Sequence, residues 1–301
     1  DIPFIHQFGT FVEENFAWNI GEREWKMQAG IRLDHASVAG SVFSPRFNAS
    51  FDLIPHTLTL SGGYGITSKM PTLLYLYPEK AYFEYVNINE LANESIPENE
   101  RLFMTTTKVY DTSNENLKVA KNHKAEIGLR LNIGKVSASV TAFQERLKNG
   151  YSLDYTFNSF HSFMYKEYTR NENGDLVLAS NLPVLNSYYT PTNNMNVQTQ
   201  GIEFDVNVGR IDAIRTSFQL NGAWMRTQSW NNGYDFYDNS GTSASSRTPV
   251  AIYEAGAVKS YRQQLATTLR ATHNIPEIGF VVTLTTQAIW NQSNWKTFGN
   301  D

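Results

Sequence analysis

Trp25-Lys26-Met27-Gln28-Ala29-Gly30-Ile31-Arg32-Leu33-Asp34 is the stretch that decides the fold. Its odd-numbered residues are apolar, and its even-numbered residues are polar, charged or glycine. A period of two indicates a β-strand with one apolar and one polar face. The same alternation recurs at 44–53, 124–133 and 201–208, and the apolar face of all four stretches has no charged residue.

Extending this pattern along the chain predicts ten strands, at 8–20, 24–35, 43–54, 57–68, 122–133, 135–146, 197–208, 214–226, 261–272 and 280–290. Most exceed the usual five or six residues, and a tilted strand needs about 9–11 residues to cross a bilayer. Short turns alternate with long segments at about 69–121, 147–196 and 227–260 and a shorter one at 36–42. Long loops at one end only are typical of outer-membrane barrels.

We therefore predict an all-β fold that forms part of a large antiparallel transmembrane β-barrel, with short periplasmic turns and long extracellular loops. Alternation alone also fits a soluble β-sandwich, so a sandwich binding module or adhesin stays open. A small closed barrel, either an enzyme or an adhesin, is a further alternative because ten is a permitted even strand number.

Composition and motifs argue against several classes of function. The net charge of −4 argues against a nucleic-acid partner. The absence of cysteine excludes disulfides and thiolate zinc sites. The six histidines lack metal-ligand spacing, and the chain has no phosphate-binding glycine loop and no nucleophile elbow. We expect no metal, no cofactor and no enzymatic activity.

The long segments contain about half of the aromatic residues, so we expect them to pack rather than to be disordered. Asn173-Gly174 predicts a β-hairpin with a type I′ turn inside the second long segment. Pro71 predicts a short helix that runs through Leu74, because proline suits a first helical turn.

Several motifs point to a known family. Gly30-Ile31-Arg32-Leu33-Asp34, Ser44-Pro45-Arg46-Phe47 and the YGITSKMPTL stretch at 64–73 resemble the β-barrel of TonB-dependent outer-membrane receptors. NENLKVAK at 114–121 and NVQTQGIE at 196–203 resemble two further motifs of that family, in the same order. The style of the loops is similar to that of Bacteroidetes receptors.

The resemblance implies an active-transport receptor in the outer membrane of a Gram-negative bacterium. Such a receptor binds a scarce solute at extracellular loops and imports it with energy supplied through TonB, so it is not an enzyme. The solute class, whether glycan, peptide, siderophore or cobalamin, stays open. Implied partners are the TonB complex, through a plug domain, and outer-membrane lipid, with a surface substrate-binding lipoprotein as a further candidate. The resemblance implies that residues 1–301 are one partial barrel without the plug and the terminal strand.

In such a barrel the polar face lines the lumen. The candidate residues for solute binding lie on that face or in the loops: Arg32, Asp34, Arg46, Asn48, Tyr75, Tyr77, Glu126, Glu145, Tyr155, Tyr165, Glu203 and Arg262. The alternative is structural, namely a network of charges paired across strands, with tyrosines that pack the loops. We further expect a shared outer surface and an open sheet in which 8–20 and 280–290 do not pair. The outer surface is predicted to contain Trp25, Ile31, Phe47, Phe51, Leu129 and Phe204.

Overall fold

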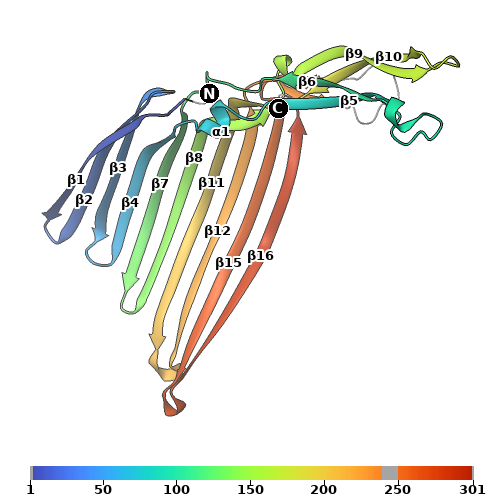
Figure 1. Cartoon of the computed structure of the whole chain (residues 1–301). Coiled ribbons are helices and arrows are strands. Elements are labelled where there is room, and N and C mark those ends of the chain that lie inside the picture. The colour runs from blue at the N-terminus through green and yellow to red at the C-terminus, as the bar shows by residue number, and fades with distance from the viewer. Residues whose placement is uncertain (1–2, 239–249, 300–301) are drawn as a thin grey trace.

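Ten strands form one antiparallel sheet in a computed structural model that describes residues 3–238 and 250–299. Neighbours in the sheet follow the order of these strands along the chain, from β1 (blue) to β16 (red) in Figure 1. Their bounds are β1 Gln7–Ile20, β2 Arg23–Ala36, β3 Gly40–Ile54, β4 Leu58–Lys69, β7 Ala120–Ile133, β8 Val136–Asp154, β11 Thr190–Ile211, β12 Thr216–Asn231, β15 Val258–Ile275 and β16 Phe280–Phe298. All ten predicted strands are confirmed.

The strands meet in tight turns at one end. Gly21, Gly134 and Gly279 adopt φ values of 65°, 58° and 69° there, a left-handed conformation that costs glycine little. Two of the turns contain short 3-10 helices, η3 Asp212–Ile214 and η4 Pro276–Ile278. Three of the four connections at the opposite end are long, as predicted, and the fourth, between β2 and β3, is only residues 37–39 (Figure 1).

The strand register places the predicted outer residues on one face, which confirms the shared apolar surface. One row crosses the sheet with each residue directly opposite the next. It runs from Trp25 through Phe51, Leu60, Leu129 and Val140 to Phe204. Ile31 and Phe47 are 53% and 42% exposed, although both are large apolar side chains. This face forms a continuous apolar band over the sheet.

Several strands extend further at the loop end than the sequence pattern predicts. β8 continues to Asp154, β11 begins at Thr190 and β16 continues to Phe298. The strands lengthen from 12 residues in β4 to 22 in β11. Toward the loop end, the last outward apolar residue of the alternating pattern is Ala142 in β8 and Ile202 in β11. Both strands continue beyond these residues, so the pattern did not mark the extensions.

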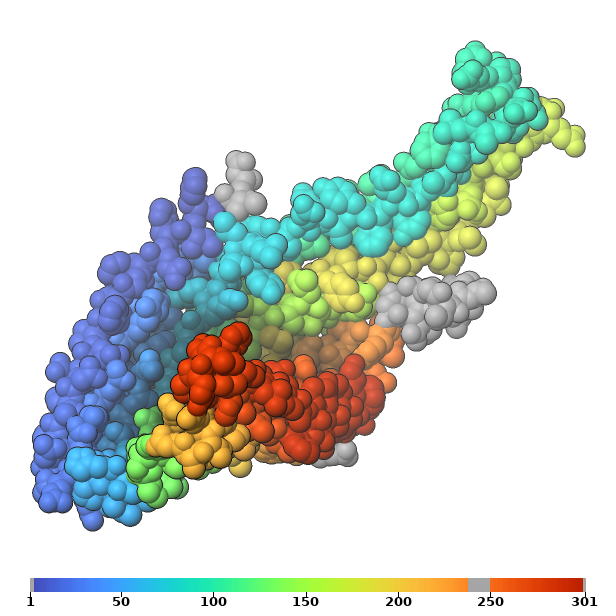
Figure 2. Space-filling view, turned by 90° about the horizontal axis from the view of Figure 1, so that it is seen from below, coloured from blue at the N-terminus to red at the C-terminus, as the bar shows by residue number. Residues whose placement is uncertain are grey.

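The long connections contain further structure at the loop end. The first contains helix α1 Leu73–Leu76, the hairpin of β5 Ala81–Asn89 and β6 Phe103–Tyr110, and η1 Glu98–Glu100. The second contains η2 Phe157–Ser159 and the hairpin of β9 Phe160–Arg170 and β10 Leu176–Ser187. The third contains β13 Asp235–Asp238 paired with β14 Val250–Tyr253. Together the β5–β6 and β9–β10 hairpins form an arm that projects sideways from the sheet (Figures 1 and 2).

The hairpin predicted in the second segment is confirmed, but its predicted type I′ turn is wrong. Gly174 is the left-handed residue, with φ 86°, and its N–H donates to Asn171 O at 3.0 Å. Asn171 N–H donates to Asp175 O at 2.9 Å, so three residues rather than two form the loop. The predicted helix is present as α1, although Pro71 precedes its N-cap residue Thr72 instead of occupying its first turn.

Among the described residues, β1 and β16 each pair with one neighbour only, so the sheet is open in this chain. Seen from the turn end, the sheet curves around a recess (Figure 2). The open sheet rules out the small closed barrel, and the single layer of ten strands rules out the sandwich. No helix in the described ranges is long and apolar enough to cross a membrane.

Candidate functional site

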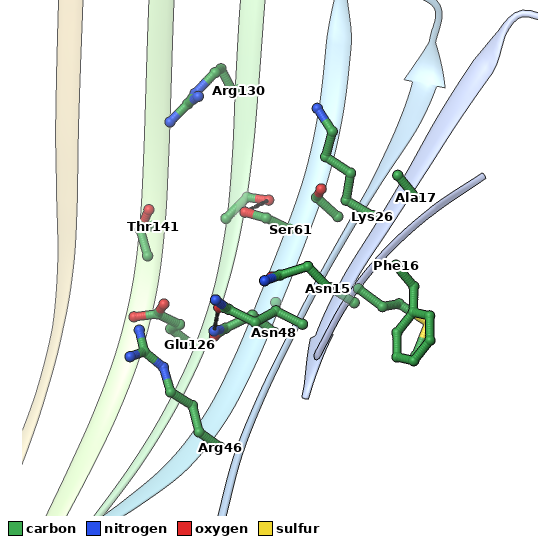
Figure 3. Close-up of a pocket in the computed structure, with 16 residues that line it drawn as sticks. Asn15, Phe16, Ala17, Lys26, Arg46, Asn48, Ser61, Glu126, Arg130 and Thr141 are labelled. Carbon is green, nitrogen blue, oxygen red and sulfur yellow. Dashed lines mark hydrogen bonds between the residues drawn. The ribbon is translucent and has the colours of Figure 1, made fainter. Parts of the chain in front are cut away.

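The polar face of the sheet is hollowed across β1–β4, β7 and β8. The hollow has a volume of about 680 Å³. Figure 3 shows polar side chains from these strands around it, whereas the Phe16 ring points away from it. The labelled polar residues are Asn15, Lys26, Arg46, Asn48, Ser61, Glu126, Arg130 and Thr141.

A chain of side-chain hydrogen bonds joins β1, β2 and β3 beside the hollow. Asn48 Nδ2 donates to Gln28 Oε1 at 2.9 Å, and Gln28 Nε2 donates to Glu13 Oε1 at 2.9 Å. Gln28 lies directly opposite Asn48, and Glu13 is a diagonal neighbour of Gln28; both positions on one face of a sheet are close enough for such contacts. Asn48 is therefore held in place by the sheet itself, with its amide beside the hollow.

Arg46 and Glu126 lie at the loop side of the hollow. They come from β3 and β7, and Figure 3 shows their charged ends pointing toward each other. They also line a second hollow, of about 380 Å³, with Lys124 and Glu145. Arg46 is exposed in this chain and Glu126 is half-buried. Both are therefore accessible to a molecule that occupies the recess.

Lys124 is the central cation of this group. Its Nζ lies 3.1 Å from Glu126 Oε2 and 3.7 Å from Glu145 Oε1, and 5.7 Å from the centre of the Phe143 ring. One ammonium is thus shared by two carboxylates. Arg46 supplies the second positive charge beside the pair, so the group carries balanced charges of both signs.

Arg32 and Asp34 form a separate pair nearer the loop end of β2. Arg32 Nε and Nη2 donate to the two Asp34 oxygens at 2.7 and 2.8 Å. The Asp34 side chain is 9% exposed and that of Arg32 is 55% exposed. A Cβ at Gly9 would lie 2.6 Å from Asp34 Oδ1, so the neighbouring strand needs glycine there. The pair lines a hollow of about 440 Å³ that also contains Arg46.

The remaining two charged candidates are not in these hollows. Glu203 of β11 lines a hollow of about 410 Å³ with Asp205 and Asn221. Arg262 of β15 lines another, of about 360 Å³, together with Lys296. The structure thus brings six candidates together on β2–β8, namely Arg32, Asp34, Arg46, Asn48, Glu126 and Glu145. Glu203 and Arg262 are positioned further along the same face.

The tyrosine candidates lie among the loops. Tyr75 and Tyr77 pack beside a small core of Leu76, Leu117, Ala120 and Tyr151. Tyr155 stacks on Tyr189 with ring centres 4.3 Å apart. Tyr165 packs against Tyr85, with ring centres 5.3 Å apart, and donates to Val86 O, which joins the two hairpins of the arm. These ring contacts confirm that the loop aromatics pack.

An ion pair that sequence reasoning missed fastens the arm. Arg170 of β9 donates from Nε and Nη2 to the two Glu90 oxygens at 2.8 and 3.1 Å. The Glu90 side chain is 8% exposed. Hydrogen bonds from Arg170 lower the pKa of Glu90, and burial opposes that effect. The two residues are 80 positions apart, and no pattern in the sequence relates them.

The chemistry of this face is that of binding. In the described ranges no group of three or more histidine or acidic residues could hold a metal ion. The face offers charges of both signs, amides and hydroxyls around open hollows. Such a surface can bind a polar solute by hydrogen bonds and ion pairs. Sequence reasoning omitted Lys26 and Arg130 from the candidates, although their even positions on alternating strands were a usable signal.

Comparison with known proteins gives one family. A family model described as TonB dependent receptor-like, beta-barrel, matches residues 4–300. No curated protein matches the chain.

The comparison with solved structures matches this chain to parts of two receptors and one transporter, among others. The siderophore receptor PirA from Acinetobacter baumannii is 16% identical, with a TM-score of 0.48, over 89% of this chain and 41% of the receptor. A mutant ferric enterobactin receptor, PfeA from Pseudomonas aeruginosa in complex with enterobactin, is 15% identical, with a TM-score of 0.48, over 89% and 38%. The outer membrane transporter YddB from Escherichia coli is 11% identical, with a TM-score of 0.37, over 91% and 45%. The chain spans less than half the length of each.

Proposed function

The chain belongs to the TonB-dependent receptor β-barrel family, and from this premise we propose that it forms part of the wall of an outer-membrane uptake receptor. The family consists of transport receptors and not of enzymes, and its members lie in the outer membrane of Gram-negative bacteria. In our proposal, residues 1–301 are one partial barrel, and the parent protein imports a scarce polar solute with energy supplied through TonB.

The observation that supports this proposal most directly is the segregation of the two faces of the sheet. The apolar band fits the hydrocarbon of a membrane, because a surface of this size is unfavourable in water. The opposite face carries the balanced charges of Arg46, Lys124, Glu126 and Glu145 around open hollows. A transport lumen that binds a polar solute briefly needs such groups.

We propose that the part of the polar face nearer the loop end binds the solute. The residues that first bind the solute are Arg32, Asp34, Arg46, Asn48, Glu126 and Glu145. Glu203 and Arg262 lie further along the same face and contact the solute afterwards. Tyr75, Tyr77, Tyr155 and Tyr165 belong to the loop structure above it. TonB acts on the parent protein through a plug domain in this proposal, and the arm offers a surface for a substrate-binding lipoprotein.

Uptake by the parent receptor tests the proposal. Cells with and without the receptor, in the presence and absence of TonB, are supplied with a mixture of ferric siderophores, cobalamin, oligopeptides and oligosaccharides. Mass spectrometry then measures which solute leaves the medium. We expect one class to be depleted only when both receptor and TonB are present. Equal depletion with and without the receptor would refute the transport function.

Variants then test the candidate site. A hydrogen bond to a charged group contributes about 1.5–3 kcal/mol, so Arg46→Leu or Glu126→Leu should lower uptake at least about tenfold. Surface labelling should show normal delivery, and Arg210→Leu at the turn end is the matched control. Equal loss of uptake and surface labelling would assign Arg46 and Glu126 a role in folding only.

A further inference from the structure

Four basic side chains share the outer face of β7 and β8 just beyond the apolar band. Lys121 lies directly opposite Lys148 in the strand register, and His123 lies directly opposite Arg146. Lys121 and His123 are two residues apart on β7, so they point to the same side. The four residues therefore form a compact two-by-two group, which we call the basic quartet.

The quartet is electrostatically unfavourable by itself. Like charges that face each other across two strands destabilise a sheet. Lys121, Arg146 and Lys148 are all close enough to His123 to interact with it electrostatically. Among the described residues, no carboxylate lies within ion-pair distance of any of the three.

On the opposite face of the same two strands, a cation has acidic partners. Lys124, next to His123 in sequence, points into the recess and has Glu126 and Glu145 as partners. Arg146, next to Glu145, points outward and has none in the described part of the chain. Compensation of charge is thus present on the lumen face and missing on the outer face.

The surroundings of the quartet are those of a membrane boundary. Its neighbours in the register on β4 and β11 are Ser68, Ile66 and Gln198, none of them acidic. Tyr64, one register row nearer the turns, is 45% exposed and has its hydroxyl 2.8 Å from His123 Nδ1. The outward residues of the next row include Ile127, which is 59% exposed. Tyrosines are enriched where a barrel passes from hydrocarbon to headgroups.

We propose that the basic quartet binds phosphate groups on lipid headgroups in the membrane leaflet at the loop side. A phosphate supplies the missing negative charge, and the acyl chains of the same molecule cover the adjacent apolar band. A lipid is favoured over a free phosphate ion because the quartet directly adjoins the apolar band. The proposal rests on the outer-membrane placement described above and is independent of the transported solute.

Lipid retention by the purified parent receptor tests this site. The receptor is exchanged into a neutral detergent containing lipid A with two phosphates, and native mass spectrometry counts the bound lipid molecules. The variant is Lys121→Gln/Arg146→Gln/Lys148→Gln. Because each basic residue near a charged membrane surface contributes separately, we expect the apparent affinity for lipid A to fall at least about tenfold. Phosphatidylcholine should bind equally to both proteins, because its choline cation already balances the charge of its phosphate.

Two control proteins keep the test decisive. Arg23→Gln/Lys135→Gln/Arg210→Gln removes the same charge at the turn end and should retain lipid A normally. Lys121→Arg/Lys148→Arg keeps the charge and should also retain it. Normal heat-dependent migration in gels establishes that each barrel is folded.

The proposal is overturned if the quartet variant retains lipid A like the unchanged receptor, or if the turn-end variant loses as much. Millimolar inorganic phosphate provides the other arm of the experiment. Binding of inorganic phosphate at the quartet without selective retention of lipid A would also overturn the proposal. Solute uptake is measured separately, so this inference and the proposed transport function can fail independently.

Discussion

The hydroxyl of Tyr151 connects the loop structure above the sheet to β4 and β7. It accepts from Ala120 N–H at 3.3 Å and lies 2.8 Å from Lys69 O and 2.9 Å from Lys118 O. Tyr151 and Ala120 are only 8% and 4% exposed. Replacing Tyr151 with phenylalanine keeps the ring, which lies 5.2 Å from the Tyr75 ring, and removes only these polar contacts.

The magnitude follows from the buried groups that lose a partner. A buried donor or acceptor left without a hydrogen bond costs about 1–3 kcal/mol. Since about 1.4 kcal/mol corresponds to a factor of ten, local opening around Ala120 should become about 5- to 150-fold more frequent. The rest of the sheet should keep its stability because the contacts are confined to this junction.

Hydrogen–deuterium exchange in the parent receptor measures this effect. Exchange should accelerate in peptides that cover 69–77 and 117–121 in Tyr151→Phe. Tyr82→Phe is the matched control, because Tyr82 is 65% exposed and its hydroxyl has no hydrogen bond within the described ranges. Unchanged exchange at both peptides would refute the reasoning, and so would acceleration spread equally over the whole barrel.

Three further predictions concern the arm, the sheet and its edges. Because the pKa of Glu90 is lowered in the folded state, its ion pair with Arg170 stabilises the arm above the ordinary glutamate pKa and is lost as the pH falls through the depressed value. Protease protection of the arm should therefore decline in acid, and Arg170→Gln should remove that pH dependence. A Cβ at Gly201 would lie 2.6 Å from Trp224 O, whereas at Gly65 its nearest contact is 3.7 Å. Overpacking costs about 1–3 kcal/mol, so Gly201→Ala should lower the yield of heat-modifiable barrel and Gly65→Ala should not. Residues 1–301 expressed alone should associate through the unpaired edges of β1 and β16, because open edges template pairing with other chains; a closed monomer in size-exclusion chromatography would contradict this.

The sequence predicted the sheet well in the part whose outer face is the apolar band. At Trp25, Phe51 and Leu129 the alternation of apolar and polar residues directly reflects the two environments, so strand existence and side-chain direction followed from it. The loop-side ends of β8 and β11 were missed because the next outward positions after Ala142 and Ile202 are polar, namely Gln144 and Arg146 in β8 and Gln200 and Gln198 in β11. Strand length there depends on pairing with neighbours, which a periodic pattern does not encode.

The candidate site was predictable only in part, because a periodic pattern gives the face of a residue but not its neighbours on other strands. Position on an even-numbered face placed Arg46 and Glu126 on the lumen side. Their proximity depends on the stagger between β3 and β7, which register alone determines. The pairing of Glu90 with Arg170 depends on how two distant hairpins stack, and the hairpin of β5 and β6 was itself not predicted.

The unequal strand lengths give this part of the wall a direction. β4 ends at Lys69, three residues beyond the outward Ile66, whereas β11 runs twelve residues past Ile202. At about 3.3 Å per residue, that continuation is roughly 40 Å of strand. On the β11 side the sheet thus extends far beyond its last outward apolar residue, whereas on the β4 side it ends close to that residue. In a barrel closed from this sheet, the rim is therefore oblique along this arc, low at β4 and high at β11.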